Sequence, residues 1–326
     1  MTVHRPVAFP IDTDVDSERH LQWEVKALWT QLEPLLPGLS VEVVARCAST
    51  STELLERARL APAPRTSDFG ALTEPSGCVG RRQADVQPCL LIAEHQTTGR
   101  GRLGRSWRST AGASLTFSLA LPLSPPDWSG LSLAVGVVLA EALQPALPPS
   151  GLQVRVKWPN DLWLVDASRP SEDGVTPAGR KLGGVLIETL AAHSRRLVVV
   201  GVGLNVLALP QALHADLGDG IAFVQEIEPA ATAPSTLARI ALPLLEGLRT
   251  FERDGFAAFA SRFAARDLLC GCAVTTSQAG VPTGIARGVD AGGALCVEDA
   301  GGEIHCVASG EVSVRPTHGR GIKLRP

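Results

Sequence analysis

The stretch GRGRLGRSWRS at residues 99–109 is followed closely by ASLTFSLALPL at 113–123, and together they restrict the fold. The glycines of the first stretch fit the G-x-G-x-x-G pattern of dinucleotide-binding folds. That pattern requires a helix directly after the glycines. The residues from 113 onward instead alternate between apolar and polar side chains, which predicts a strand. A P-loop needs the same helix, and it needs a lysine where Arg105 stands. The sequence therefore argues against both nucleotide-binding folds.

The order of elements along the chain predicts a mixed sheet rather than a regular alternation of strands and helices. Helical spacing and apolar runs predict helices at 17–36, 49–60, 131–143 and 235–269, the last with a break at Gly255, and strands at 39–47, 89–96, 113–123, 152–165 (as a pair), 181–190 and 195–207. From about residue 270, short apolar runs separated by Asp-Ala-Gly-Gly turns predict a small β-barrel. We therefore expect an α+β fold: an N-terminal tail and helix (1–38), a mixed β-sheet domain packed by helices (39–269) and the barrel (270–326).

Composition indicates a globular protein. The chain has 326 residues, a formal net charge of −3 and 45% hydrophobic residues, so any basic binding site must be local. The N-terminus lacks the apolar core of a secretory signal, and the apolar run at 131–143 contains Glu141 and is too short to span a bilayer. The seven cysteines lack the paired spacing of a zinc site, so we expect buried, reduced thiols. A cytoplasmic location without membrane contact follows as an expectation.

The chemistry of residues 99–109 suits an anionic ligand. Arginines at 100, 102, 105 and 108 can neutralise a polyphosphate, and the glycine amides can close on it. Trp107 offers a face on which a base can stack. The same residues would also fit a solvent-exposed basic turn, or a segment that binds nucleic acid or an acidic protein. We expect the segment to be mobile until its ligand arrives, because glycines and exposed arginines give it little to pack against.

Three further motifs follow in order: KWPND at 157–161, KLGGVLIE at 181–188 and GVGLN at 201–205. Together with GRGRLGRSW they resemble the biotin protein ligase family. The resemblance runs from about residue 42 to 316. It includes ASTSTELL at 48–55 and FERDGFAAFASRF at 251–263. One such motif alone is weak, whereas four in this order are specific.

The resemblance implies a catalytic domain related to class II aminoacyl-tRNA synthetases and lipoate ligases, with a C-terminal SH3-like domain. It implies that the protein activates biotin with MgATP to biotinyl-5′-AMP and transfers biotin to a lysine of the biotin carboxyl carrier domain of an acyl-CoA carboxylase. In such a reaction a carboxylate attacks the α-phosphate of ATP, so two anions meet. Cationic side chains and Mg²⁺ offset that repulsion, and no side-chain nucleophile is required.

By position, the resemblance also implies site residues, with Arg102 and Lys181 as the catalytic pair. It places the biotin site at Ser49, Thr50, Ser51, Gln96, Arg100, Gly101, Arg102, Lys181 and Gly184, and the nucleotide site at Arg105, Trp107, Asn160 and Asn205. Asp161 is the candidate ligand for Mg²⁺, and Lys157 shares its turn. Ser51 departs from the asparagine usual in the family. Each has a plainer interpretation as a helix cap, a turn residue or a surface side chain, and a structural role is expected for His95.

The predicted partner is the carrier domain, and we expect the protein not to bind DNA. About 40 residues precede the first motif, and they hold one predicted helix rather than the three of a helix-turn-helix domain. Homodimer formation, the carrier's identity and the roles of the segments at 61–88 and 166–180 stay open, as does whether the helix at 17–36 packs on the main domain or binds a partner. The alternatives are a ligase for lipoate or another acid, and a nucleic-acid-binding protein without enzymatic activity.

Overall fold

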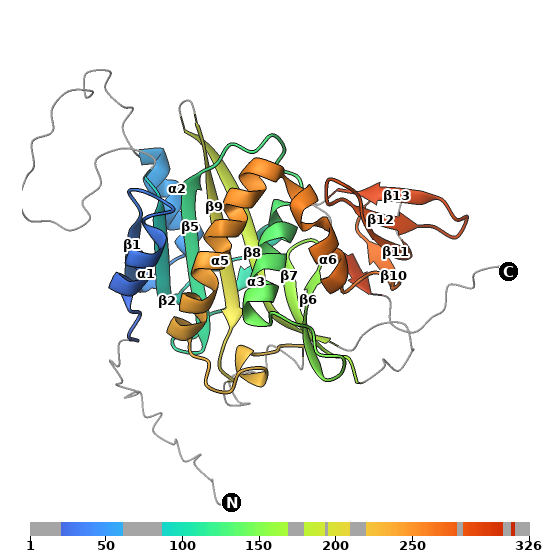
Figure 1. The fold of residues 1–326 in the computed structure, drawn as a ribbon, viewed down its shortest axis with the longest axis horizontal. Coiled ribbons are helices and arrows are strands. Elements are labelled where there is room, and N and C mark those ends of the chain that lie inside the picture. The colour runs from blue at the N-terminus through green and yellow to red at the C-terminus, as the bar shows by residue number, and fades with distance from the viewer. Residues whose placement is uncertain are drawn as a thin grey trace, which may run out of the picture.

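The computed structural model describes residues 21–60, 87–168, 179–192, 195–208, 220–278, 283–308 and 314–316. Most of the segment at 61–88, and residues 169–178 of the second insertion, lie outside this range. A large sheet with helices on both faces forms the main body, and a smaller sheet lies at one end of it (Figure 1). Within the described residues, no helix combines the length and hydrophobicity needed to cross a membrane.

The main sheet is mixed, as the sequence predicts. Its seven strands lie in the order β1-β2-β5-β9-β8-β7-β6, and only the β1–β2 pair is parallel. Their bounds are β1 (Ser40–Cys47), β2 (Cys89–Gln96), β5 (Ser114–Pro122), β6 (Leu152–Lys157), β7 (Asp161–Asp166), β8 (Gly179–Ala192) and β9 (Arg195–Asn205). The central strands β2, β5 and β9 are strongly apolar and almost wholly buried, which suits a sheet covered on both faces.

Helices α3 (Leu131–Leu143) and α5 (Ala233–Asp254) cover one face of the sheet, and α2 (Thr50–Leu60) covers the other. The short α6 (Ala260–Arg266) follows α5. Helix α5 begins where the Thr232 hydroxyl accepts a bond from the amide of Ser235 at 3.2 Å, and it ends at Gly255, whose φ of +64° stops the helix. The break expected at Gly255 is confirmed.

The N-terminal helix is shorter than predicted. Helix α1 covers Val25–Leu32, while the backbone amide of Leu21 and the indole of Trp23 donate to the Glu94 carboxylate at 3.2 and 3.0 Å. Those bonds hold residues 21–24 outside the helix. Leu28 and Leu32 are buried in the main core, so α1 packs on the main domain.

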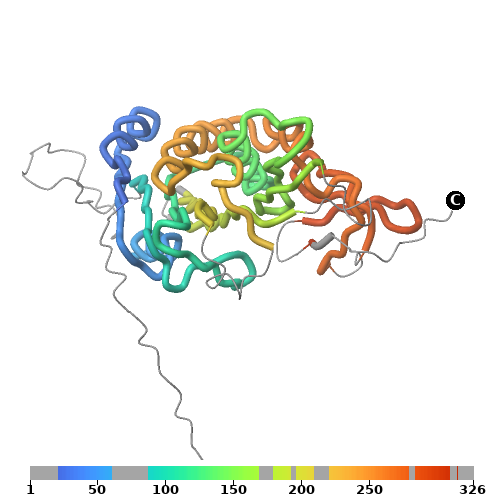
Figure 2. Tube along the Cα trace, turned by 90° about the horizontal axis from the view of Figure 1, so that it is seen from below, coloured from blue at the N-terminus to red at the C-terminus, as the bar shows by residue number. Residues whose placement is uncertain are grey.

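The C-terminal residues, orange to red at one end of the molecule in Figure 2, form a five-stranded antiparallel sheet in the order β13-β12-β11-β10-β14. The strands are β10 (Ala273–Thr276), β11 (Thr283–Val289), β12 (Leu295–Glu298), β13 (Ile304–Val307) and β14 (Val314–Pro316). The predicted turns are present: Asp290 and Asp299 each accept bonds from two backbone amides of their own turns. The expected small C-terminal β domain is confirmed as an antiparallel sheet. The pairings of the described strands do not close it into the expected barrel.

Cysteine burial differs from the prediction. Cys89 and Cys272 are buried, but Cys270 and Cys306 are exposed. Cys270 lies in the turn that precedes β10, and Cys306 lies in β13, an edge strand of the smaller sheet, on the face that meets solvent. The described cysteines are all free thiols.

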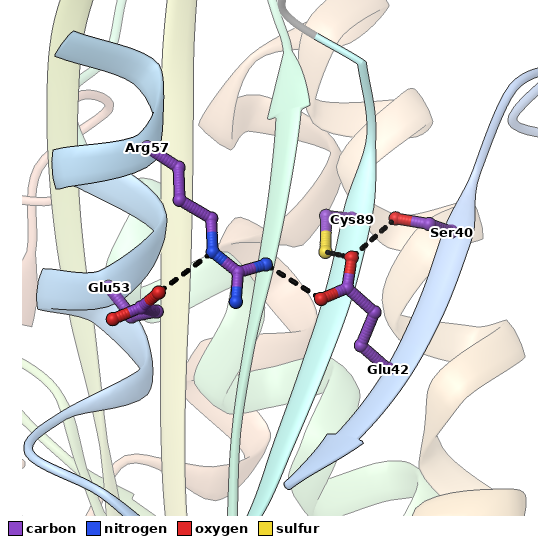
Figure 3. A network of polar contacts seen from close by, with 5 residues as sticks. All are labelled: Ser40, Glu42, Glu53, Arg57 and Cys89. Carbon is purple, nitrogen blue, oxygen red and sulfur yellow. Dashed lines mark hydrogen bonds and ion pairs between the residues drawn. The ribbon is translucent and has the colours of Figure 1, made fainter. Parts of the chain in front are cut away.

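A network of charged and polar side chains fixes α2 against the sheet (Figure 3). Arg57 binds Glu42 of β1 at 2.6 Å and Glu53 of its own helix at 2.9 Å. The hydroxyl of Ser40 and the thiol of Cys89 donate to the other Glu42 oxygen at 3.2 and 3.4 Å. Burial acts to raise the pKa of Glu42, but these bonds outweigh it and lower that pKa. The network thereby ties α2 to β1 through Arg57, in the last turn of the helix.

Candidate functional site

The arginine-glycine segment forms a hairpin. Strands β3 (Gly99–Arg100) and β4 (Ser106–Trp107) pair, and the turn between them, Arg102–Gly104, is a short 3₁₀ helix. The Gly101 amide donates to the Arg105 carbonyl at 2.7 Å, which closes the base of the turn. Strand β5 comes next, as the sequence predicts, so the helix required by a P-loop or a dinucleotide fold is absent from this described segment.

The hairpin borders a pocket that gathers all but one of the predicted site residues. The pocket is lined by Ser49, Thr50, Ser51, Gln96, Arg100, Gly101, Arg102, Arg105, Trp107, Asn160, Asp161, Lys181 and Gly184. These side chains come from the start of α2, the end of β2, the hairpin, the β6–β7 turn and the start of β8. Segments far apart in the sequence thus converge on one cavity.

One end of the pocket is a network of hydroxyl and amide groups. The Gln96 side-chain carbonyl accepts from the Thr50 amide at 2.7 Å and from the Thr50 hydroxyl at 3.2 Å. Ser118, fully buried on β5, lies 2.7 Å from the Thr50 hydroxyl and 3.0 Å from the Ser51 hydroxyl. A Cβ at Gly201 would lie 2.5 Å from the Ser51 oxygen, so that glycine makes room for it. Ser51 therefore has a defined place in this network, although the family usually has asparagine there.

The other end of the pocket is charged. The Lys181 ammonium donates to the Asp161 carboxylate at 2.7 Å. A Cβ at Gly184 would lie 3.1 Å from that carboxylate and 3.6 Å from the ammonium, so glycine leaves space beside the pair. Both side chains are only partly buried, and the pair remains open to a ligand.

Asn160 connects this pair to the hairpin. Its side-chain NH₂ donates to the Val185 carbonyl at 2.7 Å, and its side-chain oxygen accepts from Arg102 at 3.4 Å. Burial is the main cause that lowers the pKa of Arg102; Arg105 adds to this effect, whereas Asp161 opposes it. Arg102 nevertheless remains a cation at neutral pH, since arginine does not deprotonate in proteins.

Arg100 lies across the hairpin from these groups. It donates to the Thr52 hydroxyl at 3.1 Å and pairs with Glu188 at 3.3 Å. The second oxygen of Glu188 is buried and has no hydrogen-bond partner among the described residues. Glu188 does not line the pocket, and its place at the end of the KLGGVLIE segment gives no sign that it reaches Arg100.

The exception among the predicted residues is Asn205, which lines a second pocket. Trp107 lies between the two pockets and lines both, and its ring fills the space that a side chain at Gly203 would need. Asn205 donates to the Lys181 carbonyl at 3.2 Å. The second pocket also includes Phe223 and His95, whose ring nitrogen bonds with the Ser109 carbonyl at 3.1 Å.

Metal ligands are sparse in the pocket. In the part of the chain that the structure describes, the one group of three candidate ligands is Asp299, Glu303 and His305, in the C-terminal sheet. At the pocket, Asp161 supplies a single carboxylate. One carboxylate suits Mg²⁺ bound mainly through substrate phosphates and water, but not a metal held wholly by protein.

Ser118 is a second residue that sequence reasoning missed. Its one signal is a hydroxyl within the apolar alternation of β5, and many such hydroxyls merely bond to a neighbouring strand. Thr116, two residues earlier, does so: it donates to the Ala93 carbonyl at 2.8 Å. Only the packing of α2 against β5 distinguishes the two.

Comparison with known proteins agrees with this geometry. Residues 81–205 match the biotin/lipoate A/B protein ligase family, and residues 271–315 match the biotin protein ligase C-terminal domain. The chain is 33% identical to biotin–[acetyl-CoA-carboxylase] ligase of Mycobacterium tuberculosis over 83% of this chain and 88% of the relative. It is 32% identical to the bifunctional ligase/repressor BirA of Escherichia coli over 86% and 75% of the two chains.

Among solved structures, the fold resembles that of an Aquifex aeolicus biotin protein ligase in complex with biotin and ATP. The TM-score is 0.58 at 24% identity, covering 86% of this chain and 100% of the other. A variant of the same Aquifex protein with biotin gives a TM-score of 0.60 at 24% identity, covering 85% and 99% of the two chains. Both likenesses concern the fold: a mixed-sheet domain followed by a small antiparallel one. With the sequence identities, the matched domains and the converging pocket, the chain belongs to the biotin protein ligase family.

Proposed function

We propose that the protein activates biotin with ATP to biotinyl-5′-AMP and then transfers the biotinyl group to a lysine of a biotin carboxyl carrier domain. In the first step a biotin carboxylate oxygen bonds to the α-phosphorus, and the bond from that phosphorus to pyrophosphate breaks. In the second step the carrier amine attacks the acyl carbon, and AMP leaves. The relatives named as biotin–[acetyl-CoA-carboxylase] ligase and ligase/repressor support this assignment.

The observation that carries the proposal is the two-ended pocket. The network of Thr50, Ser51 and Gln96 lies at one end, and the Lys181–Asp161 pair lies at the other. Biotin has the same polarity: a ureido ring with one carbonyl and two N–H groups at one end, and a carboxylate at the other. The hydroxyl and amide groups suit the ring, and the lysine suits the carboxylate.

Lys181 and Arg102 are the proposed catalytic residues. Lys181 attracts both the attacking carboxylate and the α-phosphate, so it lowers the repulsion between them. Arg102 closes over the same point from the hairpin, and Asn160 orients it through the 3.4 Å contact. Asp161 holds the lysine ammonium in place before substrate binds.

Arg100, Gly101 and Gly184 complete the proposed biotin site. Arg100 covers the ligand from the hairpin, while the two glycines let ligand atoms approach the main chain closely. Ser49, which faces the pocket at the start of α2, adds a further hydroxyl beside the ureido ring.

The nucleotide is proposed to extend from Lys181 past Trp107 into the second pocket. Arg105 lies on the phosphate side, and the Trp107 ring offers a stacking face. Asn205 in that pocket supports placement of the base there. Mg²⁺, held by Asp161 together with the phosphates, would supply charge neutralisation at the reacting phosphoryl group.

Lipoate is the competing substrate, because the matched family includes lipoate ligases. Its dithiolane ring has no hydrogen-bonding groups, so it would leave the buried Thr50–Ser118–Gln96 network unmatched. The test incubates the protein with MgATP and either acid, then identifies the released adenylate by mass spectrometry. We expect biotinyl-AMP, and a lipoyl-AMP signal at least tenfold lower. Equal signals, or lipoyl-AMP alone, would overturn the assignment.

The remaining expectations stay predictions of this proposal. A cytoplasmic location and the lack of DNA binding can be checked by fractionation and by gel shift with biotinyl-AMP present. Sedimentation would decide whether the chain forms a homodimer, which stays open. The carrier domain is the proposed protein partner.

A further inference from the structure

The C-terminal sheet places two thiols opposite each other. Cys296 in β12 pairs with Cys306 in β13 in the antiparallel register. Their neighbours Leu295, Val297 and Val307 are buried, so the alternation of the strands turns both cysteines toward the outer face. Cys296 is half-buried and Cys306 is exposed.

The backbone hydrogen bonds between β12 and β13 show whether Cys296 and Cys306 form a hydrogen-bonded or a non-hydrogen-bonded pair of the antiparallel ladder. The Asp299 amide donates to the Glu303 carbonyl at 2.9 Å, so that pair is hydrogen-bonded. Pair types alternate along an antiparallel ladder, which makes Cys296–Cys306 a non-hydrogen-bonded pair. In such pairs the Cα atoms are only about 4.5 Å apart and the side chains are close. That separation lies within the range that a disulfide can bridge.

The surroundings of Cys296 suppress its ionisation. Its thiol donates to the Ala294 carbonyl at 4.0 Å, and its pKa is raised, first by burial and then by Cys306 and Asp290. A thiol whose ionisation is suppressed is a poor initial nucleophile. Cys306, which solvent reaches freely, is therefore the thiol that meets an incoming reagent.

We propose that Cys296 and Cys306 form a cross-strand dithiol that small oxidised thiols of the glutathione type convert reversibly to an intramolecular disulfide. The Cys306 thiolate attacks the reagent's disulfide, forms a mixed disulfide and releases one reduced thiol. Cys296 then loses its proton to solvent and attacks the Cys306 sulfur, which releases the second. The protein loses two electrons and two protons, and the reagent gains them.

The two cysteines lie outside the proposed ligase site, but the strand that carries Cys296 begins close to a residue that contacts the pocket lining. Strand β12 starts two residues after Gly293, whose carbonyl accepts a bond from the Trp158 indole at 3.0 Å. Trp158 lines the main pocket. The disulfide would join two strands that are already adjacent, so it leaves the substrate contacts unchanged and can be tested without reference to ligase activity.

The experiment treats the reduced full chain with oxidised glutathione, quenches with acid, alkylates the remaining thiols and maps the peptides. We expect a peptide pair linked through Cys296 and Cys306, and its loss after dithiothreitol. Cys270, an exposed thiol elsewhere in the domain, should stop at the glutathione adduct and serves as the internal control.

Single variants then separate the two roles. In Cys296→Ser, Cys306 should stop at the glutathione adduct; in Cys270→Ser, the Cys296–Cys306 link should form as in the wild type. Near-ultraviolet circular dichroism checks that the variants are folded. Three results with the wild-type protein would each overturn the proposal. They are a stable glutathione adduct on Cys306, a disulfide from Cys296 or Cys306 to a different cysteine, and free thiols at both Cys296 and Cys306 after Cys270 has reacted.

Discussion

Ser118 lies outside the pocket but bonds to two residues that line it. It has hydroxyl partners on both Thr50 and Ser51, the residues that start α2. We expect Ser118→Ala to raise KM for biotin by about threefold to tenfold, the cost of one weakened hydrogen bond, with little change in kcat. Steady-state kinetics measures both.

Thr116→Val is the matched control for this variant. Thr116 is also buried on β5, but its hydroxyl bonds to the Ala93 carbonyl rather than to α2. That variant should lose stability without a change in KM. A Ser118→Ala enzyme with the wild-type KM would remove Ser118 from the binding network.

Asp267 gives the chain a pH-dependent stability. Burial raises its pKa to about 6, against bonds from the Leu269 and Cys270 amides and the charge of Arg155, which lower it. One carboxylate oxygen is buried without a partner among the described residues. Because the folded-state pKa exceeds the unfolded value, the folded state binds more protons between about pH 4 and 6. Stability from this group is complete below that window and is lost as the pH rises through it.

Asp267→Asn removes this dependence. At pH 7 the variant should be more stable than the wild type by up to about 3 kcal/mol, the free energy of a two-unit pKa shift. The difference should shrink as the pH falls below 6 and vanish near 4. Urea unfolding of both proteins across this range measures it. A difference that does not vary with pH would contradict the account.

The β3–β4 hairpin is the element that covers the pocket, and Arg102 is its innermost cation. We expect Arg102→Ala to speed dissociation of biotinyl-AMP about tenfold or more, because a charge-assisted hydrogen bond is lost. Stability should change by less than about 0.5 kcal/mol, since the hairpin contributes little to the core. Ligand-release kinetics and thermal unfolding test the two parts, with Arg253→Ala, an exposed arginine on α5, as the control. Unchanged release, or a large loss of stability, would contradict the assignment.

Local sequence signals predict most elements of this chain. The apolar run at Leu131–Leu143 forms α3 with the predicted bounds, and the alternation in β5 correctly excludes two phosphate-binding folds. Where the prediction for α1 was too long, the cause is tertiary: Glu94, distant in sequence, binds Leu21 and Trp23. Helical periodicity carries no information about such a partner.

The site could be predicted as far as its motifs extend. Gln96, Lys181 and Asp161 lie where motif order places them, in one pocket. Asn205 lies beyond Trp107 in a second pocket, and the roles of Ser118 and Glu188 depend on packing between elements. Spacing along the chain cannot reveal a contact that exists only after α2 and the hairpin pack on the sheet.

The two sheets of the molecule meet at the pocket, whose lining includes residues of both. The Lys157 ammonium donates to the Val314 carbonyl at 3.0 Å, and the Trp158 indole donates to the Gly293 carbonyl at 3.0 Å. Val314 itself lines the pocket. The C-terminal sheet therefore helps to fix the β6–β7 turn that carries Asn160 and Asp161, so the part of the pocket around the Lys181–Asp161 pair depends on both sheets.

The most direct test of the proposed function is the intact mass of a biotin carboxyl carrier domain after incubation with this protein, biotin and MgATP. We expect one added biotinyl group, which disappears when ATP is omitted or when the acceptor lysine of the carrier is replaced by arginine. Lys181→Ala should reduce the rate by at least about a hundredfold, because the cation at the reacting phosphate is lost. A carrier of unchanged mass after incubation with folded wild-type protein, or full activity in Lys181→Ala, would contradict the account.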